Sequence, residues 1–382
     1  MPSPSVADLR EREFPWTRDR IYLNHASIGP IPARTQRAID AVEAKRRDPG
    51  GFDDTELMAI LRSARAAVAD FLGARPDEVA LAPNTSYGLN VAAAVLPLRA
   101  GDTVLLPDGE FPATVYPWLL RQRHGVRVEL VPRTPEGWPD EERLVERVRD
   151  PAVRVLAVSF VQFASGYRLD LDRLGRACRS SDTFLVVDAI QGLGQCPLRV
   201  DEVPVDLLAC GAQKWLLGPW GAGFLYVRRD LVTELEPAFA GWMAFRGTDD
   251  FSRLTDYDAT FHADARRFEM VTLPFQDLAG MTASLGLLRE MGVERVAAHQ
   301  RSLRRVLEEA MAGGEITLAS PTDARHDSGI WCVRTPDVGS AYARLRAAGV
   351  VASLREGSIR LSPHGYNTAD EVARVVDVLE GR

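Results

Sequence analysis

Short apolar runs alternate with amphipathic segments through the first half of the chain. The apolar runs lack a polar face and are too short for core helices, which is typical of strands buried on both faces of a sheet. Alternation of such strands with amphipathic helices predicts a largely parallel sheet covered by helices. The expected strands lie at 78–82, 103–106, 126–131, 153–159, 183–187 and 205–210, and the expected helices at 33–45, 54–72, 87–96, 141–148 and 171–180.

The pattern changes near residue 276, where a long helical stretch starts and continues through Leu288 and Val296 to Met311. Shorter elements follow in an α+β arrangement. We expect strands at 329–334, 350–354 and 358–361 and helices at 339–348 and 369–379. The sequence therefore divides into an N-terminal arm (1–19) that packs with the small domain, a large domain (20–275) and a small C-terminal domain (276–382).

Composition narrows the class of protein. The chain has 382 residues, 46% of them apolar, which is enough for about two domains with a large core. A net charge of −7 without long basic runs argues against nucleic acid as a partner. No stretch approaches membrane-span length and no apolar segment follows a basic N-terminus, so we expect a cytoplasmic protein without membrane contact. The four cysteines lack CxxC spacing and the six histidines lack HxxxH spacing, so no metal site is visible.

Two residues at predicted strand ends carry the strongest chemical signal. Asp188 follows the apolar run 183–187, and Lys214 follows the run 205–210 and precedes the Gly-rich segment WLLGPWGAGFLYV. Apolar surroundings lower the pKa of a lysine and make its amine a better nucleophile towards an aldehyde. Taken singly, a lysine is usually a surface residue and such an aspartate a helix cap. Together they are what a pyridoxal phosphate (PLP) enzyme needs, a Schiff-base lysine and a carboxylate for the ring nitrogen.

The motifs around these residues extend the pattern. They read strand–D-x-x-Q, strand–x-x-K and then G-P-x-G-x-G-x-L-Y-V, and they resemble the fold-type I PLP enzymes of the class V aminotransferase and cysteine desulfurase group. The resemblance implies an α/β fold with a mainly parallel seven-stranded sheet covered by helices, plus a smaller α+β C-terminal domain. It implies pyridoxal 5'-phosphate as cofactor, with Lys214 and Asp188 as catalytic residues and Gln191 on the phenolic oxygen.

Several polar residues fit the cofactor phosphate. Thr85 and Ser86 directly precede the predicted helix 87–96. At a helix N-terminus, hydroxyls, free N–H groups and the helix dipole favour an anion, although a plain helix cap would use the same residues. The segment is similar to the family's G-T-T-x-x-I-N, which favours phosphate binding. Gln213 stands where the family has His and can also donate to phosphate. Thr272 matches the Thr of R-F-E-x-G-T, which implies a homodimer with a shared active site; an ordinary loop threonine is the alternative.

Two aromatic residues replace polar ones of the family. Phe111 occupies the position of the His that stacks on the pyridoxal ring; a phenyl ring can stack there but cannot transfer a proton. Phe163, in FVQFASG, occupies the position of the Asn that contacts the phenolic oxygen in desulfurases, and we expect it to border the substrate. Chemistry that depends on that His is therefore not expected.

The substrate side of the site is predicted from both ends of the chain. SIRLSPHGYNT matches C-R-x-S-x-x-x-Y-N-T, and the resemblance implies that Arg360 binds the substrate α-carboxylate through a fork that lysine could not reproduce. The loop YLNHASIGP enters the active site in the family, which makes Asn24 and His25 candidate ligands; turn formation is the alternative. Residues 350–359 contain no cysteine, which argues against a persulfide-forming desulfurase.

The resemblance therefore implies an enzyme acting on a small-molecule α-amino acid or amino-acid conjugate, with aminotransferase or epimerase-type chemistry at Cα. The isopenicillin N epimerase-like branch looks nearest, since it also departs from the desulfurase His and Cys. Two alternatives remain: a C–S lyase acting by β-elimination on a cysteine-derived substrate, and a non-catalytic binding module. A requirement for a keto acid would separate transamination from elimination.

Overall fold

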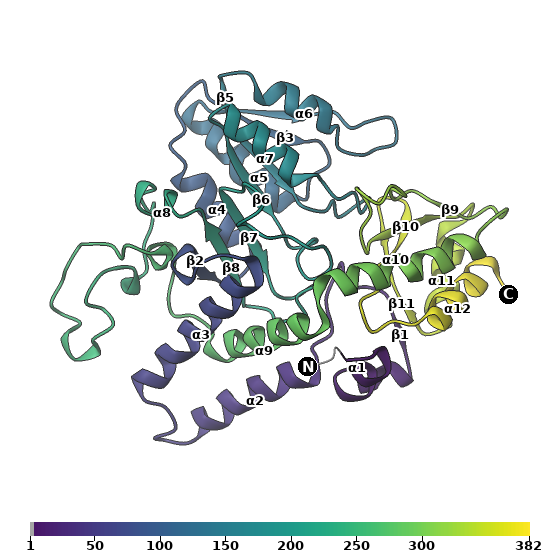
Figure 1. The fold of residues 1–382 in the computed structure, drawn as a ribbon, viewed down its shortest axis with the longest axis horizontal. Helices are drawn as coiled ribbons and strands as arrows, with labels where there is room; N and C mark the ends of the chain where they lie inside the picture. The colour runs from purple at the N-terminus through teal and green to yellow at the C-terminus, as the bar shows by residue number, and fades with distance from the viewer. Residues whose placement is uncertain (1–3) are drawn as a thin grey trace.

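Seven strands form the central sheet of the computed structural model, which describes residues 4–382 (Figure 1). The strand order is β2-β8-β7-β6-β5-β3-β4, in which β8 is antiparallel to both neighbours and the other pairs are parallel. The predicted α/β class with a mainly parallel seven-stranded sheet is confirmed. The strands are β2 (Val79–Ala82), β3 (Thr103–Pro107), β4 (Arg127–Val131), β5 (Val153–Ser159), β6 (Phe184–Asp188), β7 (Leu207–Gly211) and β8 (Gly223–Val227).

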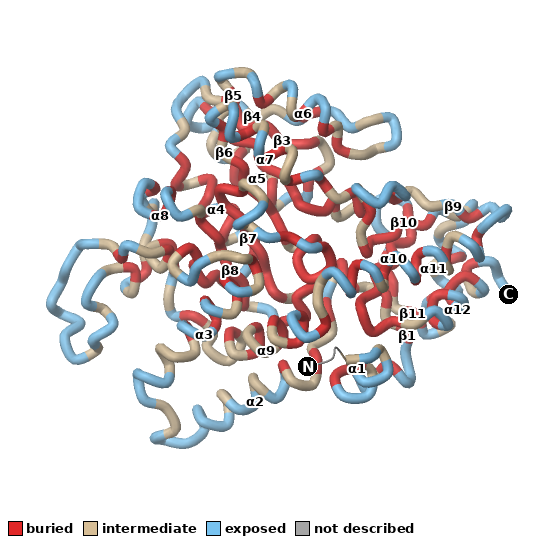
Figure 2. Tube along the Cα trace, in the orientation of Figure 1, coloured by how far each residue is buried: buried red, intermediate tan, exposed pale blue. Residues whose placement is uncertain are grey.

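Helices cover both faces of this sheet because alternate residues of each strand point to opposite sides. In β5, Leu156 and Val158 face one core cluster, whereas Val155 and Ala157 face the other. The first cluster packs against α3 (Asp54–Leu72), α6 (Glu141–Val148), α7 (Leu171–Ser180) and α9 (Phe275–Met291), and the second against α4 (Thr85–Val95), α5 (Pro112–Arg121) and α8 (Leu231–Glu234). Burial on both faces explains the uninterrupted apolar runs (Figure 2).

The C-terminal domain has its own core. Its antiparallel sheet has the order β12-β13-β10-β9. One face of the sheet, with Trp331, Val333, Ile359 and Leu361, packs on the helices. The strands are β9 (Thr317–Leu318), β10 (Trp331–Arg334), β12 (Ser353–Arg355) and β13 (Ser358–Leu361), and the helices are α10 (Val293–Ala310), α11 (Val338–Ala347) and α12 (Ala369–Glu380).

The N-terminal residues join this domain. In the arm, α1 (Val6–Arg12) is linked to α12 by Arg10, whose Nη1 donates to Glu371 Oε1 at 2.7 Å. The Phe14 ring stacks on Tyr366 at a centroid distance of 4.0 Å. Beyond residue 19, β1 (Ile21–Tyr22) pairs in parallel with β11 (Val350–Val351), and α2 (Ala33–Arg47) then returns to the large domain.

Three details differ from the predicted elements. The long helix from residue 276 is two helices, because Gly292 has a φ of 74° that ends α9 before α10 begins. The predicted strand 350–354 is divided at Ala352, where the chain leaves β11 and enters β12. The predicted boundary at residue 275 places α9 in the small domain, but residues such as Leu278 and Leu285 pack in the core of the large domain.

The segment between α8 and α9 extends away from the central sheet as an open excursion (Figure 1) and is largely exposed (Figure 2). It exposes several large apolar side chains: Phe239, Trp242, Leu254, Tyr257 and Met270. Within residues 4–382, none of the helices combines the length and apolar character that spanning a membrane would require.

Candidate active site

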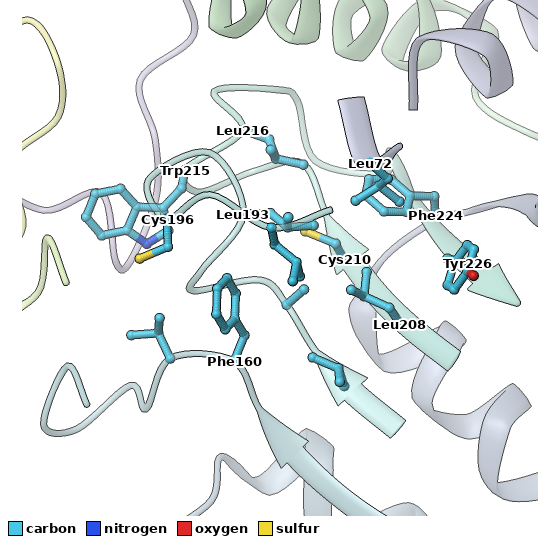
Figure 3. Close-up of a cluster of buried hydrophobic side chains, with 14 of the residues drawn as sticks. Leu72, Phe160, Leu193, Cys196, Leu208, Cys210, Trp215, Leu216, Phe224 and Tyr226 are labelled. Atoms are coloured by element: carbon cyan, nitrogen blue, oxygen red, sulfur yellow. The ribbon is translucent and has the colours of Figure 1, made fainter. Parts of the chain in front are cut away.

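The backbone at Lys214 is fixed from two sides. Just after β7, Trp215 and Leu216 contribute their side chains to the buried cluster drawn in Figure 3. The segment before α2 crosses this turn, where Gly29 N donates to Gln213 O at 2.8 Å. A Cβ at residue 29 would lie 2.0 Å from the Lys214 carbonyl oxygen, so the crossing requires glycine.

Burial is the main influence on the Lys214 amine. It lowers the pKa of Lys214 from 10.5 to about 8; the negative charge of Asp188 opposes the fall and the positive charge of Arg360 adds to it. Nζ lies 5.7 Å from the centroid of the Phe111 ring. The sequence has one other lysine, Lys45, which is exposed and ion-paired on α2. Lys214 is therefore the lysine that its surroundings prepare as a nucleophile or base.

Asp188 lies at the C-terminal end of β6, beside Ser159 of the neighbouring strand. Its carboxylate accepts a hydrogen bond from Thr114 Oγ1 at 3.2 Å and from the backbone N–H of Ile190 at 3.0 Å. Burial raises the pKa of Asp188, while these two bonds and the charge of Lys214 act in the opposite direction. A buried carboxylate with few fixed partners is suited to a cationic N–H.

Both the nitrogen and the oxygen of the Gln191 side-chain amide form hydrogen bonds within the protein. Nε2 donates to the carbonyl oxygen of Ala26 at 2.9 Å, and Oε1 accepts from Trp215 Nε1 at 2.9 Å. Only the second N–H of the amide remains for a bond to a cofactor oxygen, which is the role predicted for Gln191.

His25 does not face a substrate site. It is fully buried, its Nδ1 lies 2.8 Å from Ser362 O, and its Nε2 lies 2.7 Å from the Tyr366 hydroxyl. Burial lowers its pKa well below the usual value, so the ring is neutral at pH 7. We therefore correct its predicted role: with both ring nitrogens engaged, His25 holds the N-terminal segment against the C-terminal domain.

At the start of α4, the residue that caps the helix differs from the residues that remain available to a ligand. Asn84 is the N-cap, and its side chain accepts from Tyr87 N at 2.9 Å. Thr85 is buried and its Oγ1 accepts from Gly211 N at 2.8 Å, which leaves its hydroxyl hydrogen free, and Ser86 is exposed beside it. The capping alternative is thus met by Asn84, while Thr85 and Ser86 keep donors for an anion at the positive end of the helix.

Gly211 provides space next to these donors. A Cβ at residue 211 would lie 2.4 Å from Gln213 Oε1 and 3.3 Å from Thr85 Oγ1. The Gln213 amide and the Thr85 hydroxyl therefore both lie next to Gly211, in space that a side chain at residue 211 would occupy. Two of the four predicted phosphate ligands, Thr85 and Gln213, thus lie next to one glycine, and a third, Ser86, follows Thr85 in the chain. Thr272, the fourth, is exposed near the end of the segment between α8 and α9.

An aromatic pair borders Lys214. The rings of Phe111 and Phe163 meet edge to face with centroids 5.3 Å apart, and Phe111 remains 43% exposed. Phe111 therefore has a free ring face beside the Lys214 amine, which suits stacking on a planar ring.

Glu110 positions this pair, and it is the functional residue that the sequence patterns left without a role. Its buried carboxylate accepts from Ser159 N at 2.8 Å, from the Ser159 hydroxyl, and from Gln162 Nε2 at 2.6 Å. Burial raises the pKa of Glu110 to about 7. Because Glu110 precedes Phe111 and Gln162 precedes Phe163, the hydrogen bonds join the two segments that carry the rings. The available signal in the sequence was its position directly before Phe111.

Arg360 is a buried cation without a carboxylate. Its Nη1 donates to Phe163 O at 2.9 Å and its Nη2 to Ser27 Oγ at 2.8 Å, while its buried Nε has no partner. Within residues 4–382 no carboxylate oxygen lies within 4.0 Å of it. Burial, followed by the charge of Arg355, lowers the pKa of Arg360 to about 10. The Oδ1 atom of Asn24 is also buried without a partner.

These observations test whether the residues fit PLP. An amine with a lowered pKa, a buried carboxylate, a free aromatic face and a small-residue cradle of hydroxyl and amide donors match the aldehyde, ring nitrogen, ring plane and phosphate of that cofactor. The fit is made by Lys214, Asp188, Phe111 and Thr85, with Gln213 closing the cradle.

The chain is similar to known proteins over most of its length. Residues 52–375 match the family model described as aminotransferase class-V. The chain is 30% identical to the uncharacterized aminotransferase YcbU of Bacillus subtilis, over 84% of this chain and 83% of the relative. It is 29% identical to the isopenicillin N epimerase of Amycolatopsis lactamdurans over 94% of each chain. Its fold is similar to a cysteine desulfurase of Thermococcus onnurineus NA1, with a TM-score of 0.89, 24% identity and coverage of 100% and 99%.

Proposed function

The chain belongs to the class-V aminotransferase family of PLP-dependent enzymes, and we propose that it acts on the Cα of an α-amino acid or amino-acid conjugate, by transamination or epimerisation. The β12–β13 hairpin contains no cysteine, and all four cysteines are buried, which favours these reactions over persulfide formation. β-Elimination of a cysteine-derived substrate is the alternative; it would need no keto acid and would release a β-fragment.

Each residue has a distinct task in this proposal. PLP, when bound, supplies an electron sink for negative charge at the substrate Cα. Lys214 binds the cofactor covalently and moves the proton at Cα, for which an amine with a pKa of about 8 is suited. Asp188 holds the proton on the ring nitrogen, Phe111 stacks on the ring, and Thr85 donates to the phosphate.

The observation that supports an amino-acid substrate most directly is the unpaired Arg360. A buried guanidinium without a counter-ion is costly, and a substrate carboxylate would supply the missing charge and a partner for Nε. Its present partners are neutral oxygens of Phe163 and Ser27, which a carboxylate can displace. Arginine can also grip that carboxylate with two parallel hydrogen bonds.

The test is the variant Arg360→Met, which keeps the volume and removes the charge. We expect the KM for the amino acid that shifts the visible spectrum of the holoenzyme to rise about a hundredfold, because a buried charged hydrogen-bond pair is lost. Arg360→Lys should recover part of the loss. The control is Arg346→Met, at an exposed position on α11. An unchanged KM in Arg360→Met would show that Arg360 does not bind the substrate.

We also propose a homodimer in which Thr272 completes the phosphate site of the partner subunit. The support is the exposure of Thr272 and of the apolar side chains on the excursion before α9, which a second copy would cover. Sedimentation equilibrium of the holoenzyme should give twice the chain mass of 42.1 kDa. A single-chain mass at micromolar concentration would contradict the shared site.

A further inference from the structure

The sheet of the C-terminal domain has two chemically different faces. Its apolar residues pack on the helices, as described above. Cys332 and Arg360 are paired across β10 and β13 on the opposite face, which lies against the large domain. There Cys332 Sγ donates to Ala164 O at 3.0 Å and Arg360 donates to Phe163 O. Side chains on this second face therefore point towards the active site.

Arg355 lies on the same face as Arg360. In the β12–β13 hairpin Ser353 pairs with Arg360 and Arg355 pairs with Ser358, so the two arginines are diagonal neighbours on one face. Such neighbours have Cα atoms about 7 to 8 Å apart. The charge of Arg355 lowers the pKa of both Arg360 and Lys214, which agrees with a position at the opening of the site.

Neither arginine is neutralised. Arg355 is exposed and donates only to the carbonyl oxygen of Leu354, at 2.8 Å, and within residues 4–382 no carboxylate lies within 4.0 Å of it. Among the described residues, other exposed arginines such as Arg346 also lack a carboxylate within 4.0 Å, but Arg355 differs from Arg346 in sharing a sheet face with Arg360. The buried Oγ of Ser353, directly opposite Arg360, also lacks a partner. The hairpin thus presents two cations and an unused hydroxyl to one space.

We propose that the substrate is an amino acid with a second carboxylate, which Arg355 binds while Arg360 binds the α-carboxylate. This rests on the proposed function and narrows its substrate class. Two like charges on one hairpin face are unfavourable without a ligand, and a dicarboxylate neutralises both. A monocarboxylic substrate would leave Arg355 unmatched at the opening of the site.

The experiment measures recognition without chemistry. The holoenzyme is titrated calorimetrically with glutarate and with pentanoate, which has the same chain length but one carboxylate and, like glutarate, no amine. We expect glutarate to bind about tenfold more tightly, as a charged hydrogen bond contributes. Arg355→Gln should remove this preference and leave pentanoate binding unchanged, and Arg355→Lys should keep most of it. Arg346→Gln, which removes the same charge from α11 on the far face of the sheet, should behave as wild type.

Equal binding of the two acids by the wild type would overturn the proposal, as would an Arg355→Gln variant that weakens both alike. A second assay compares kcat/KM for glutamate and glutamine, with aspartate and 2-aminoadipate to find the preferred length. Failure of the proposed function looks different, since then no amino acid of either kind changes the visible spectrum. The glutarate comparison still decides the role of Arg355 in that case, because it needs no amine.

Discussion

Replacing Lys214 by alanine is expected to lower kcat by at least about a thousandfold, the range that general acid–base groups contribute. The variant removes the one amine that burial brings to a pKa of about 8, and the neighbouring Asp188 and Phe111 cannot substitute for it. It should also lose the covalent link to PLP. Borohydride reduction followed by peptide mapping checks this directly, because a wild-type adduct should lie on the peptide that contains Lys214.

The test is specific because the chain contains only two lysines. Lys45 is the only competing lysine side chain, so Lys45→Ala is a matched control that should keep full turnover and the same adduct. The pH dependence gives a second readout. Below pH 8 the Lys214 amine is protonated and unreactive, and above it the free base dominates, so its labelling in the PLP-free protein should be half-maximal near pH 8. A labelling midpoint near 10.5 or an active Lys214→Ala variant would refute the assigned role.

The second large effect concerns stability. Glu269 is buried and receives two hydrogen bonds from Arg65 of α3, at 2.9 and 2.6 Å, and one from the Leu81 backbone N–H of β2, at 2.9 Å. Glu269→Ala would leave the Arg65 guanidinium buried without its counter-ion. We expect the free energy of unfolding to fall by about 3–5 kcal/mol, measured by chemical denaturation.

Two controls separate the buried charge from a general effect of substitution. Glu142→Ala breaks an ion pair of similar length on the surface, 2.6 Å from Arg173, and should leave the free energy of unfolding unchanged within error. The double variant Arg65→Met, Glu269→Leu should recover much of the loss, because no charge remains buried. If Glu269→Ala is as stable as wild type, the ion pair does not hold α3 and β2 together.

The sequence predicted most of the fold because its local signals agree with the tertiary structure. The apolar runs that became β5 and β6 are buried on both faces, so their pattern has one physical interpretation. The errors arose where a tertiary contact determines which strand a segment joins. Residues 350–354 read as one strand, yet β11 pairs with β1 and β12 with β13, a choice that depends on a segment near the N-terminus.

The site was predicted unevenly for the same reason. Lys214 and Asp188 come at the ends of apolar strands, so their position at the C-terminal ends of the parallel strands could be inferred. His25 was assigned to substrate because its motif carried no information about Tyr366 and Ser362, which hold its ring nitrogens. The role of Glu110 depends on its bonds to Ser159 and Gln162, which no sequence spacing predicts.

The bond between Arg360 and Ser27 has a consequence for the synthesis of the protein. It joins residues 333 positions apart, and β1 likewise finds its partner strand only near the end of the chain. At translation rates of about 5–20 residues per second, the first residues of the site wait roughly 20 to 70 s for the last. A nascent chain therefore contains Lys214 long before Arg360 exists, and the substrate selection that we propose for Arg360 requires a finished chain.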